Sequence, residues 1–265
     1  MSKKIGLALG SGGARGVAHL GVIKALEEEG IRPDYITGCS MGAVVGAGYA
    51  NGLTVDDMYE IVVKLKAINL IDFSAVPITK LAVFKGNKVQ NLLLSKIGTV
   101  QFGDLKIPFK CVASDLYSGR LVVLSEGSVA RAVRASSSMP GIFPPVKIDN
   151  TLLIDGGVLC RVPTEQVWDM GADAVIAVDV LCNTGEPVKH VRSMLSLTTR
   201  IFDMMDYNGT EMKRKLTARK GEIYVVPEMK GQSQYAVKDL DKAYEAGYDT
   251  AKAQMKEIKK LVFGK

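Results

Sequence analysis

Histidine is scarce in this sequence. His19 and His190 are the only two histidines among 265 residues, and there is no H-E-x-x-H motif and no cluster of histidine and cysteine. Zinc sites in proteins are assembled mainly from these two residue types, so the sequence predicts no metal site. Chemistry that depends on a histidine base also has only two candidates to supply it.

Long hydrophobic runs are missing as well. No stretch approaches the roughly 20 apolar residues that a membrane-spanning helix requires. The apolar run 5–9 is too short for a signal peptide, and it continues into a glycine loop where a cleavage site would be expected. We therefore expect a cytoplasmic protein, and peripheral attachment at the inner membrane surface is compatible with that expectation.

Paired cysteines are also absent. Cys39, Cys111, Cys160 and Cys182 show no C-x-x-C spacing. Because no export signal is recognisable, we expect reduced thiols in place of disulfides.

The charge pattern argues against a nucleic-acid partner. Lys and Arg exceed Asp and Glu by 34 to 28, which gives a formal net charge of +6. The basic residues are spread along the chain, and no basic patch is interleaved with aromatic residues. The excess is typical of a solvated surface, and contact with an anionic membrane is the less favoured reading. The sequence does not reveal the oligomeric state.

Strand-like and helix-like runs alternate along the chain. The expected strands are 4–9, 34–37, 109–113, 121–125, 152–154, 174–180 and 223–227. The expected helices are 17–29, 43–50, 55–66, 87–96, 129–135, 164–170, 191–215 and 240–262. This alternation predicts an α/β fold, a three-layer and mostly parallel sheet flanked by helices. No repeat or linker is visible, so we expect one domain over residues 1–265.

The most informative motif is a G-x-S-x-G sequence at Gly38–Gly42 (GCSMG). It lies between a short strand-like run and a helix-like run of small residues. A serine on such a sharp strand-to-helix turn has an exposed hydroxyl, and the flanking glycines relieve the crowding of the turn. Ser40 is therefore a candidate nucleophile, with the positive end of a helix dipole beside it.

A glycine-rich loop, Gly10–Gly16 (GSGGARG), follows the first expected strand. It does not fit a dinucleotide fingerprint, because Arg15 stands where G-x-G-x-x-G requires glycine, and we predict no cofactor. Consecutive glycines can instead turn backbone N–H groups toward one point. The loop is thus a candidate oxyanion hole around Gly12 and Gly13, braced by Arg15.

The serine needs a base, and the residues leave several candidates open. His19 lies within an expected helix, where a packing role is the more common one. His190 would complete a Ser40–Asp155–His190 triad in the chain order of α/β-hydrolases. Asp155 ends an apolar strand and is followed by two glycines, although Asp-Gly is also a common turn pair. Asp115 and Asp179 end apolar strands too and are ranked below Asp155 as turn or capping residues.

Taken together, these motifs resemble the patatin-like phospholipase family, in particular its small bacterial members. The likeness rests on Gly12–Gly16, Gly38–Gly42 and Asp155–Gly157 in that order, and it extends over about residues 4–180. Supporting stretches are 113–116, 135–145 and 171–179.

The resemblance implies a Ser–Asp dyad without histidine. Ser40 would then be the nucleophile and Asp155 the base, with an oxyanion hole at Gly12 and Gly13 supported by Arg15. The implied activity is hydrolysis of lipid or other carboxylic esters through an acyl-serine intermediate, as in a phospholipase A, lysophospholipase or esterase.

Two departures from the family pattern affect the same site. Ser11 stands where many members have a glycine, and Cys160-Arg161 follows the Asp-Gly-Gly segment where many have an Asn-Pro-type pair. Neither change removes a catalytic atom, but both bear on efficiency and substrate.

The alternative to an enzyme is a regulatory or scaffold protein that retains the hydrolase fold. A methionine-rich stripe (Met194, Leu197, Ile201, Met204, Met205, Met212 and Leu216) is usually core, although such faces also serve adaptable binding. A second stripe along 240–262, followed by lysines, is expected to pack on the domain, with membrane contact as the minority reading. The apolar segment 67–85 could equally form a cap over a pocket or pack on the core.

Overall fold

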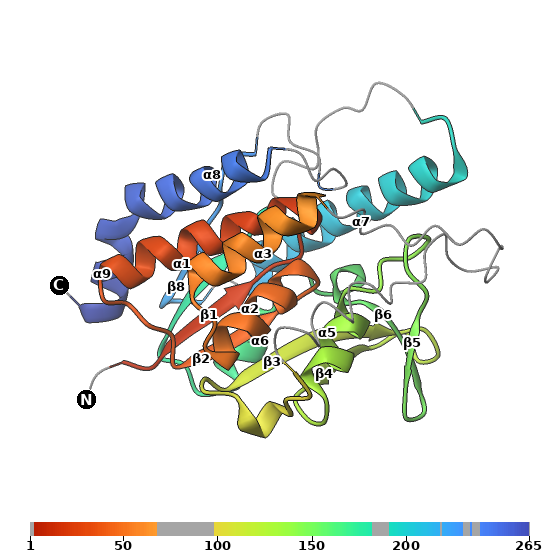
Figure 1. Cartoon of the computed structure of the whole chain (residues 1–265), viewed down its shortest axis with the longest axis horizontal. Coiled ribbons are helices and arrows are strands. Elements are labelled where there is room, and N and C mark those ends of the chain that lie inside the picture. The colour runs from red at the N-terminus through yellow and green to blue at the C-terminus, as the bar shows by residue number, and fades with distance from the viewer. Residues whose placement is uncertain are drawn as a thin grey trace.

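The computed structural model describes residues 3–67, 98–181, 191–217, 219–229, 234 and 239–264. Within these residues a mixed sheet has helices on both faces (Figure 1). The strands are β1 (Ile5–Leu9), β2 (Tyr35–Gly38), β3 (Phe109–Asp115), β4 (Leu121–Leu124), β5 (Val146–Ile148), β6 (Thr151–Asp155), β7 (Ala174–Val178) and β8 (Glu222–Val225). The helices are α1 (Ala18–Glu28), α2 (Met41–Asn51), α3 (Val55–Ala67), α5 (Val129–Ser136), α6 (Thr164–Trp168), α7 (Met194–Thr217), α8 (Leu240–Ala253) and α9 (Met255–Phe263). Short 3-10 turns are η1 (Gly13–Val17), η2 (Phe102–Asp104) and η3 (Gly156–Val158).

The sheet has the order β5-β6-β3-β2-β1-β7-β8, and β4 pairs with β3. The strands from β3 to β8 in this order are parallel, whereas β4, β5 and β6 make antiparallel pairs. The α/β class is therefore confirmed, with an antiparallel edge added to the parallel part. The short chain segments 116–120 and 149–150 explain that edge, since connections of this length can only join antiparallel neighbours.

The two faces of β1 differ in side-chain size. Leu7 and Leu9 belong to the main core on the side of α1 and α2, whereas Ala8 faces the smaller cluster that contains Val167 of α6. Alternate residues of a strand point to opposite faces. Small residues on one face let α6 pack close to the sheet, and large residues on the other fill the core.

The C-terminal helical region packs on the domain, as expected. It divides at Gln254 into α8 and α9, and α8 runs along α1 (Figure 1). Its apolar residues Ala251, Ile258 and Val262 are 0%, 0% and 5% exposed. This stripe therefore offers no exposed apolar face to a membrane.

The opposite holds for α7, where the expectation of a core stripe is wrong. The seven residues of the predicted stripe are between 42% and 78% exposed, and we call them the methionine face: Met194, Leu197, Ile201, Met204, Met205, Met212 and Leu216. Among the described side chains of α7, only Asp206 is buried. The helix is thus attached to the domain through its polar side.

One strand was not predicted from the sequence, and two predictions concern segments that lie outside the described residues. The three-residue strand β5 was not anticipated, because it is too short to show a periodic pattern. The expected helix 87–96 and most of the segment 67–85 lie outside the described residues. No helix in the described part of the chain is long and apolar enough to span a membrane.

Candidate active site

The register of β3 brings two strand ends together. Gly38, the last residue of β2, lies opposite Cys111, and Asp155, the last residue of β6, lies opposite Ala113. β2 runs parallel to β3 and β6 runs antiparallel to it, so their C-terminal ends meet near the middle of β3. Ser40, two residues beyond Gly38, is thereby placed beside Asp155.

Ser40 occupies a strained turn between β2 and α2. Its φ of 53° and ψ of −120° lie in a region that non-glycine residues rarely adopt, and such a conformation costs about 1–3 kcal/mol. A Cβ placed on Gly42 would come within 2.2 Å of the Leu9 carbonyl oxygen, so only glycine allows α2 to begin so close to β1. The backbone N–H of Ser40 donates to Ser136 Oγ at 3.0 Å. The turn is therefore held from both the sheet and α5.

Asp155 is buried, at 2% exposure, and its hydrogen-bond donors among the described residues are all neutral. Its Oδ1 accepts from the Gly157 backbone N–H at 2.8 Å and from Cys39 Sγ at 3.9 Å. Burial raises the pKa of Asp155 to about 6, and hydrogen bonds from Ser40, Gly157 and Cys39 oppose that rise. The carboxyl group is thus ionised at neutral pH, lies close enough to the Ser40 side chain for that side chain to affect its pKa, and is more basic than an aspartate in water.

The glycine loop closes a third side of this site. Gly157, which follows Asp155, lies against the Ser11 side chain, and Gly16 lies against the Met41 side chain at the start of α2. The loop is fixed to the sheet by hydrogen bonds from the backbone N–H of Gly10 to Val178 O and of Ser11 to Arg161 O.

Gly12 and Gly13 lie in this loop. Gly13 has a φ of 51°, and a Cβ there would come within 2.3 Å of the Gln234 carbonyl oxygen, which instead accepts from the Ala14 N–H. Within the described part of the chain, the N–H groups of Gly12 and Gly13 have no carbonyl partner. Arg15 is 7% exposed, and its N–H donates to Gly12 O at 3.0 Å. The loop therefore holds two available donors above a buried arginine.

His19 supports the loop and does not bond to Ser40. It is fully buried, and its Nε2–H donates to the Gly10 carbonyl oxygen at 2.8 Å. Burial lowers the pKa of His19 to about 4, so the ring is neutral at pH 7. His190, the other histidine, lies outside the described residues.

The two lower-ranked aspartates have other partners. Asp115 accepts hydrogen bonds from the Ser118 hydroxyl and from the backbone N–H groups of Tyr117 and Leu152, so it stabilises the turn after β3. Asp179 accepts from the Leu181 N–H and pairs with Arg161.

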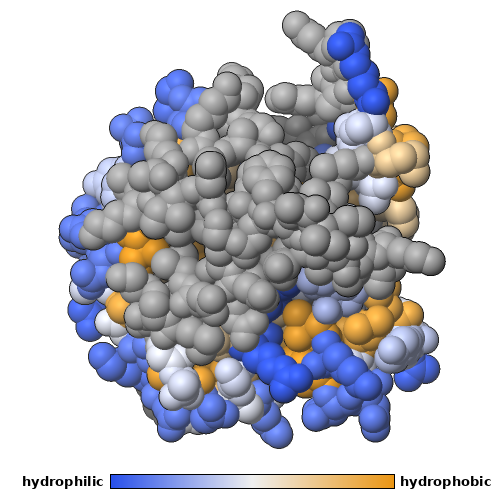
Figure 2. Space-filling model, turned by 45° about the vertical axis from the view of Figure 1, so that its right-hand side comes forward, coloured by the Kyte–Doolittle hydropathy of each residue, from blue (hydrophilic) through white to orange (hydrophobic). Residues whose placement is uncertain are grey.

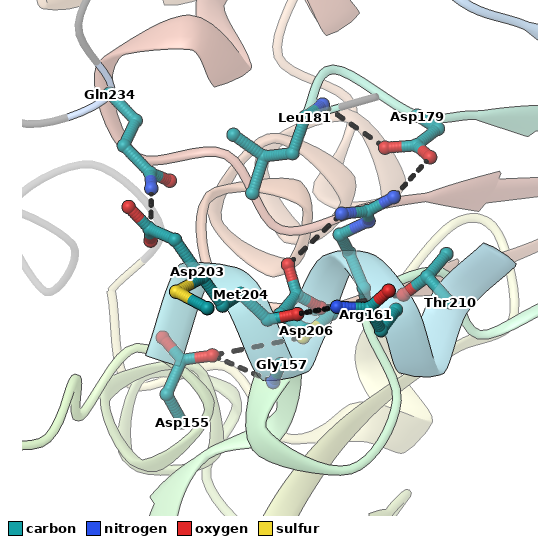
Figure 3. A network of polar contacts seen from close by, with 12 residues as sticks. Asp155, Gly157, Arg161, Asp179, Leu181, Asp203, Met204, Asp206, Thr210 and Gln234 are labelled. Carbon is teal, nitrogen blue, oxygen red and sulfur yellow. Dashed lines mark hydrogen bonds and ion pairs between the residues drawn. The ribbon is translucent and has the colours of Figure 1, made fainter. Parts of the chain in front are cut away.

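Arg161 is a residue whose role the sequence did not reveal. Its guanidinium lies between two buried carboxylates, at 2.8 Å from Asp179 and 3.1 Å from Asp206, as Figure 3 shows with Asp155 nearby. Burial raises the pKa of Asp206 to about 7, with Arg161 acting against the rise. Asp206 is 45 residues away in the sequence, so no local pattern could have indicated this pairing. The ion pairs of Arg161 with Asp179 and Asp206 attach α7 and the end of β7 to the segment that follows Asp155.

A small pocket lies between that segment and α7. Its volume is about 80 Å³, below the roughly 300–1,000 Å³ of typical ligand pockets. Its lining includes Gly157, Cys160, Arg161, Met205, Asp206 and Thr210, but not Ser40.

The chain matches a known family model and is similar to several known proteins. A family model described as "Patatin-like phospholipase" matches residues 7–168. The chain is 34% identical over 212 residues to an "Uncharacterized NTE family protein" of Mycobacterium tuberculosis, covering 77% of this chain and 59% of the relative. It is 36% identical over 181 residues to "Lysophospholipase nte1" of Aspergillus fumigatus, covering 67% of this chain but only 12% of that protein.

The fold has a solved counterpart in VipD from Legionella pneumophila. The TM-score is 0.53 at 15% sequence identity, and the match covers 97% of this chain and 67% of VipD. At this identity the likeness concerns the fold alone.

Replacing Asp155 with asparagine is expected to stabilise the protein above pH 6. The pKa of Asp155 is raised from 3.8 to about 6 in the folded state, so its contribution to stability is full below pH 3.8 and is lost as pH rises through 6. Asp155→Asn should therefore raise the free energy of unfolding by about 3 kcal/mol at pH 8, and the gain should shrink toward pH 4. Urea denaturation at both pH values measures this difference.

Asp115→Asn provides a control of opposite sign. Hydrogen bonds from Ser118 and the backbone lower the pKa of Asp115, so its ionised form stabilises the fold above the unfolded pKa. This variant should lose stability at pH 8 and lose less at low pH. If Asp155→Asn also destabilised the protein at pH 8, the raised pKa would be contradicted.

Arg161→Met is expected to destabilise the protein strongly. The change leaves Asp179 and Asp206 buried without their cation, for which a cost of about 3–5 kcal/mol is typical. Lys4→Met breaks a partly exposed ion pair with Asp34, and should cost less than about 1 kcal/mol. Equal effects of the two changes in urea denaturation would show that the buried ion pairs of Arg161 do not anchor α7.

Proposed function

The chain belongs to the patatin-like phospholipase family, and from this we propose that it is a serine acyl hydrolase in which Ser40 and Asp155 form a catalytic dyad. The proposed substrates are lipid esters, with simpler carboxylic esters as surrogates. The chain spans about three fifths of the mycobacterial relative and about an eighth of the fungal one, so the activity of those whole proteins enters only as support.

The proposal rests on one observation: Ser40, in a strained backbone conformation, lies beside the buried carboxylate of Asp155, whose hydrogen-bond donors carry no charge. Asp155 is ionised at pH 7 and has a pKa of about 6, close to the value that suits a general base at that pH. The Ser40 side chain is close enough to act on the pKa of Asp155, and in the proposed reaction the two groups form the hydrogen bond through which the proton passes.

In the proposed reaction Asp155 takes the Ser40 hydroxyl proton while Ser40 Oγ attacks the ester carbonyl carbon. The tetrahedral intermediate collapses, and Asp155 returns the proton to the leaving alkoxide, which departs as an alcohol. Water then attacks the acyl-serine, giving its proton to Asp155. Collapse of the second intermediate expels Ser40 Oγ, which takes the proton back from Asp155, and releases a carboxylic acid.

The negative oxygen of each intermediate needs donors, which we assign to Gly12 and Gly13. Their N–H groups lack a carbonyl partner among the described residues, and Gly13 is fixed by its left-handed conformation. The N-terminus of α2 at Met41 adds a positive dipole end directly behind Ser40. One such donor is typically worth about 3–4 kcal/mol in the transition state. In this proposal Arg15 supports the loop from below.

We expect Ser40→Ala and Asp155→Asn each to lower hydrolysis of a soluble ester by about a thousandfold or more, since each removes one member of the dyad. Fluorophosphonate labelling of wild type should disappear in Ser40→Ala. Rates with p-nitrophenyl butyrate, and labelling detected on a gel, measure both effects.

His190→Ala is the matched comparison. It should keep most of the wild-type rate if the base is Asp155 alone, whereas a loss as large as that of Ser40→Ala would favour a triad. Full activity in folded Asp155→Asn would overturn the dyad. Absence of labelling in folded wild type would favour a scaffold role without catalysis.

The pH dependence gives a separate test. Protonation of Asp155 removes the base, so kcat/KM should fall about tenfold per pH unit below an apparent pKa near 6. The rate is measured from pH 4.5 to 8 with circular dichroism to confirm folding. Because a histidine base would titrate in the same range, the profile is repeated in His190→Ala, where it should be unchanged. A flat profile in that variant would contradict Asp155 as the base.

A further inference from the structure

The methionine face occupies one continuous side of α7. Residues three, four and seven apart on a helix lie on the same side, and the seven members of the face share one side from Met194 to Leu216, with the exposed Asn208 between Met205 and Met212. With 24 residues at about 1.5 Å each, α7 is about 36 Å long. Figure 2 shows hydrophobic side chains gathered where the start of α7 comes forward. Single exposed apolar residues are ordinary, whereas a continuous face of this size marks an interaction surface.

The charges of α7 are distributed unevenly around this face. Asp206 points inward to Arg161, Asp203 bonds to Gln234, and Glu211 bonds to Arg214. Asp206 is therefore directed away from the methionine face, and Asp203 and Glu211 each have a partner. Lys215, by contrast, lies within it and is exposed.

Basic residues also flank the helix. Arg192 precedes it and is exposed, and Arg219 and Lys220 follow its end and are exposed as well. An apolar face bordered by positive charge, on a chain of formal net charge +6, complements a surface that is apolar beneath and negative at its boundary.

The face adjoins the proposed site. α7 packs against η3, which directly follows Asp155, and Asp155 raises the pKa of Asp206 by its charge. The C-terminal helices α8 and α9 present no comparable surface, since Leu240, Ala251, Met255, Ile258 and Val262 are buried and Phe263 is their single exposed large apolar residue. A lipid-cleaving site needs access to its substrate in a membrane, and α7 is the amphipathic helix next to that site.

From these observations we infer that the methionine face of α7 docks the protein on an anionic phospholipid bilayer and brings the Ser40–Asp155 site to the lipid surface. This inference rests on the proposed function. Flexible methionine side chains suit such a surface, because they adapt to irregular neighbours. The basic residues at the ends of α7 then interact with the anionic headgroups.

The test compares vesicle binding by two sets of variants. Leu197→Gln, Ile201→Gln, Met212→Gln and Leu216→Gln are combined to remove the apolar face, and all four positions are exposed, so folding is expected to be retained. Val123→Gln with Phe263→Gln is the matched control, since these side chains are 42% and 51% exposed but lie on β4 and α9. Ser40→Ala is present in every protein to prevent lipid turnover.

Co-sedimentation with vesicles of phosphatidylglycerol and phosphatidylcholine in equal parts is the measurement. We expect the fourfold change to weaken partitioning by at least about tenfold, and the control pair by less than about twofold. Binding of the unaltered face should weaken in high salt and on vesicles of phosphatidylcholine alone. Equal sedimentation of the fourfold variant and the control, or no binding to anionic vesicles at all, would overturn the inference.

Two further measurements separate the alternatives. Light scattering that shows a dimer with the intact face and a monomer with the fourfold variant, together with no vesicle binding, would assign the face to a second copy of the chain. With Ser40 restored, the fourfold variant should hydrolyse p-nitrophenyl butyrate at the wild-type rate. Inactivity of wild type on that ester would overturn the proposed function but not the vesicle result.

Discussion

The burial of Asp155 without a cation is the constraint on which the rest of the site depends. The groups that hold its pKa down are a hydroxyl, a thiol and a backbone N–H. Burial outweighs these neutral donors, so the pKa rises to about 6. The carboxylate is consequently a stronger base than a solvated aspartate. This is how a chain with two histidines could run serine chemistry without using either.

A second buried carboxylate, that of Asp179, does have a cation beside it. Asp179 is fully buried, but Arg161 lies 2.8 Å away and satisfies its charge. The two aspartates are both buried and differ in their partners. Arg161 belongs to the segment that begins at Asp155, and its carbonyl also holds the Ser11 N–H. One short stretch of chain thus carries both the unpaired carboxylate and the ion pair that fixes its surroundings.

The sequence predicted those parts of the site that depend on local pattern. The strand ends at Gly38 and Asp155, the turn at Ser40 and the loop at Gly12 and Gly13 all follow from short-range spacing, and the structure places them beside one another. Arg161 with Asp206 could not be found in this way, because their contact depends on how α7 packs. The direction of the methionine face was also out of reach, since periodicity locates a stripe without saying which side faces the core.

The ion pair between Arg161 and Asp206 does not by itself explain why the methionine face points outward. Turning the methionine face inward would separate Asp206 from Arg161, at a cost of about 3–5 kcal/mol. Burying seven exposed apolar side chains would yield more than this, even at about 1 kcal/mol each. A helix chosen for stability alone would therefore present its apolar side to the core. The outward orientation forgoes that stability, as is expected of a surface retained for an interaction and not for the fold.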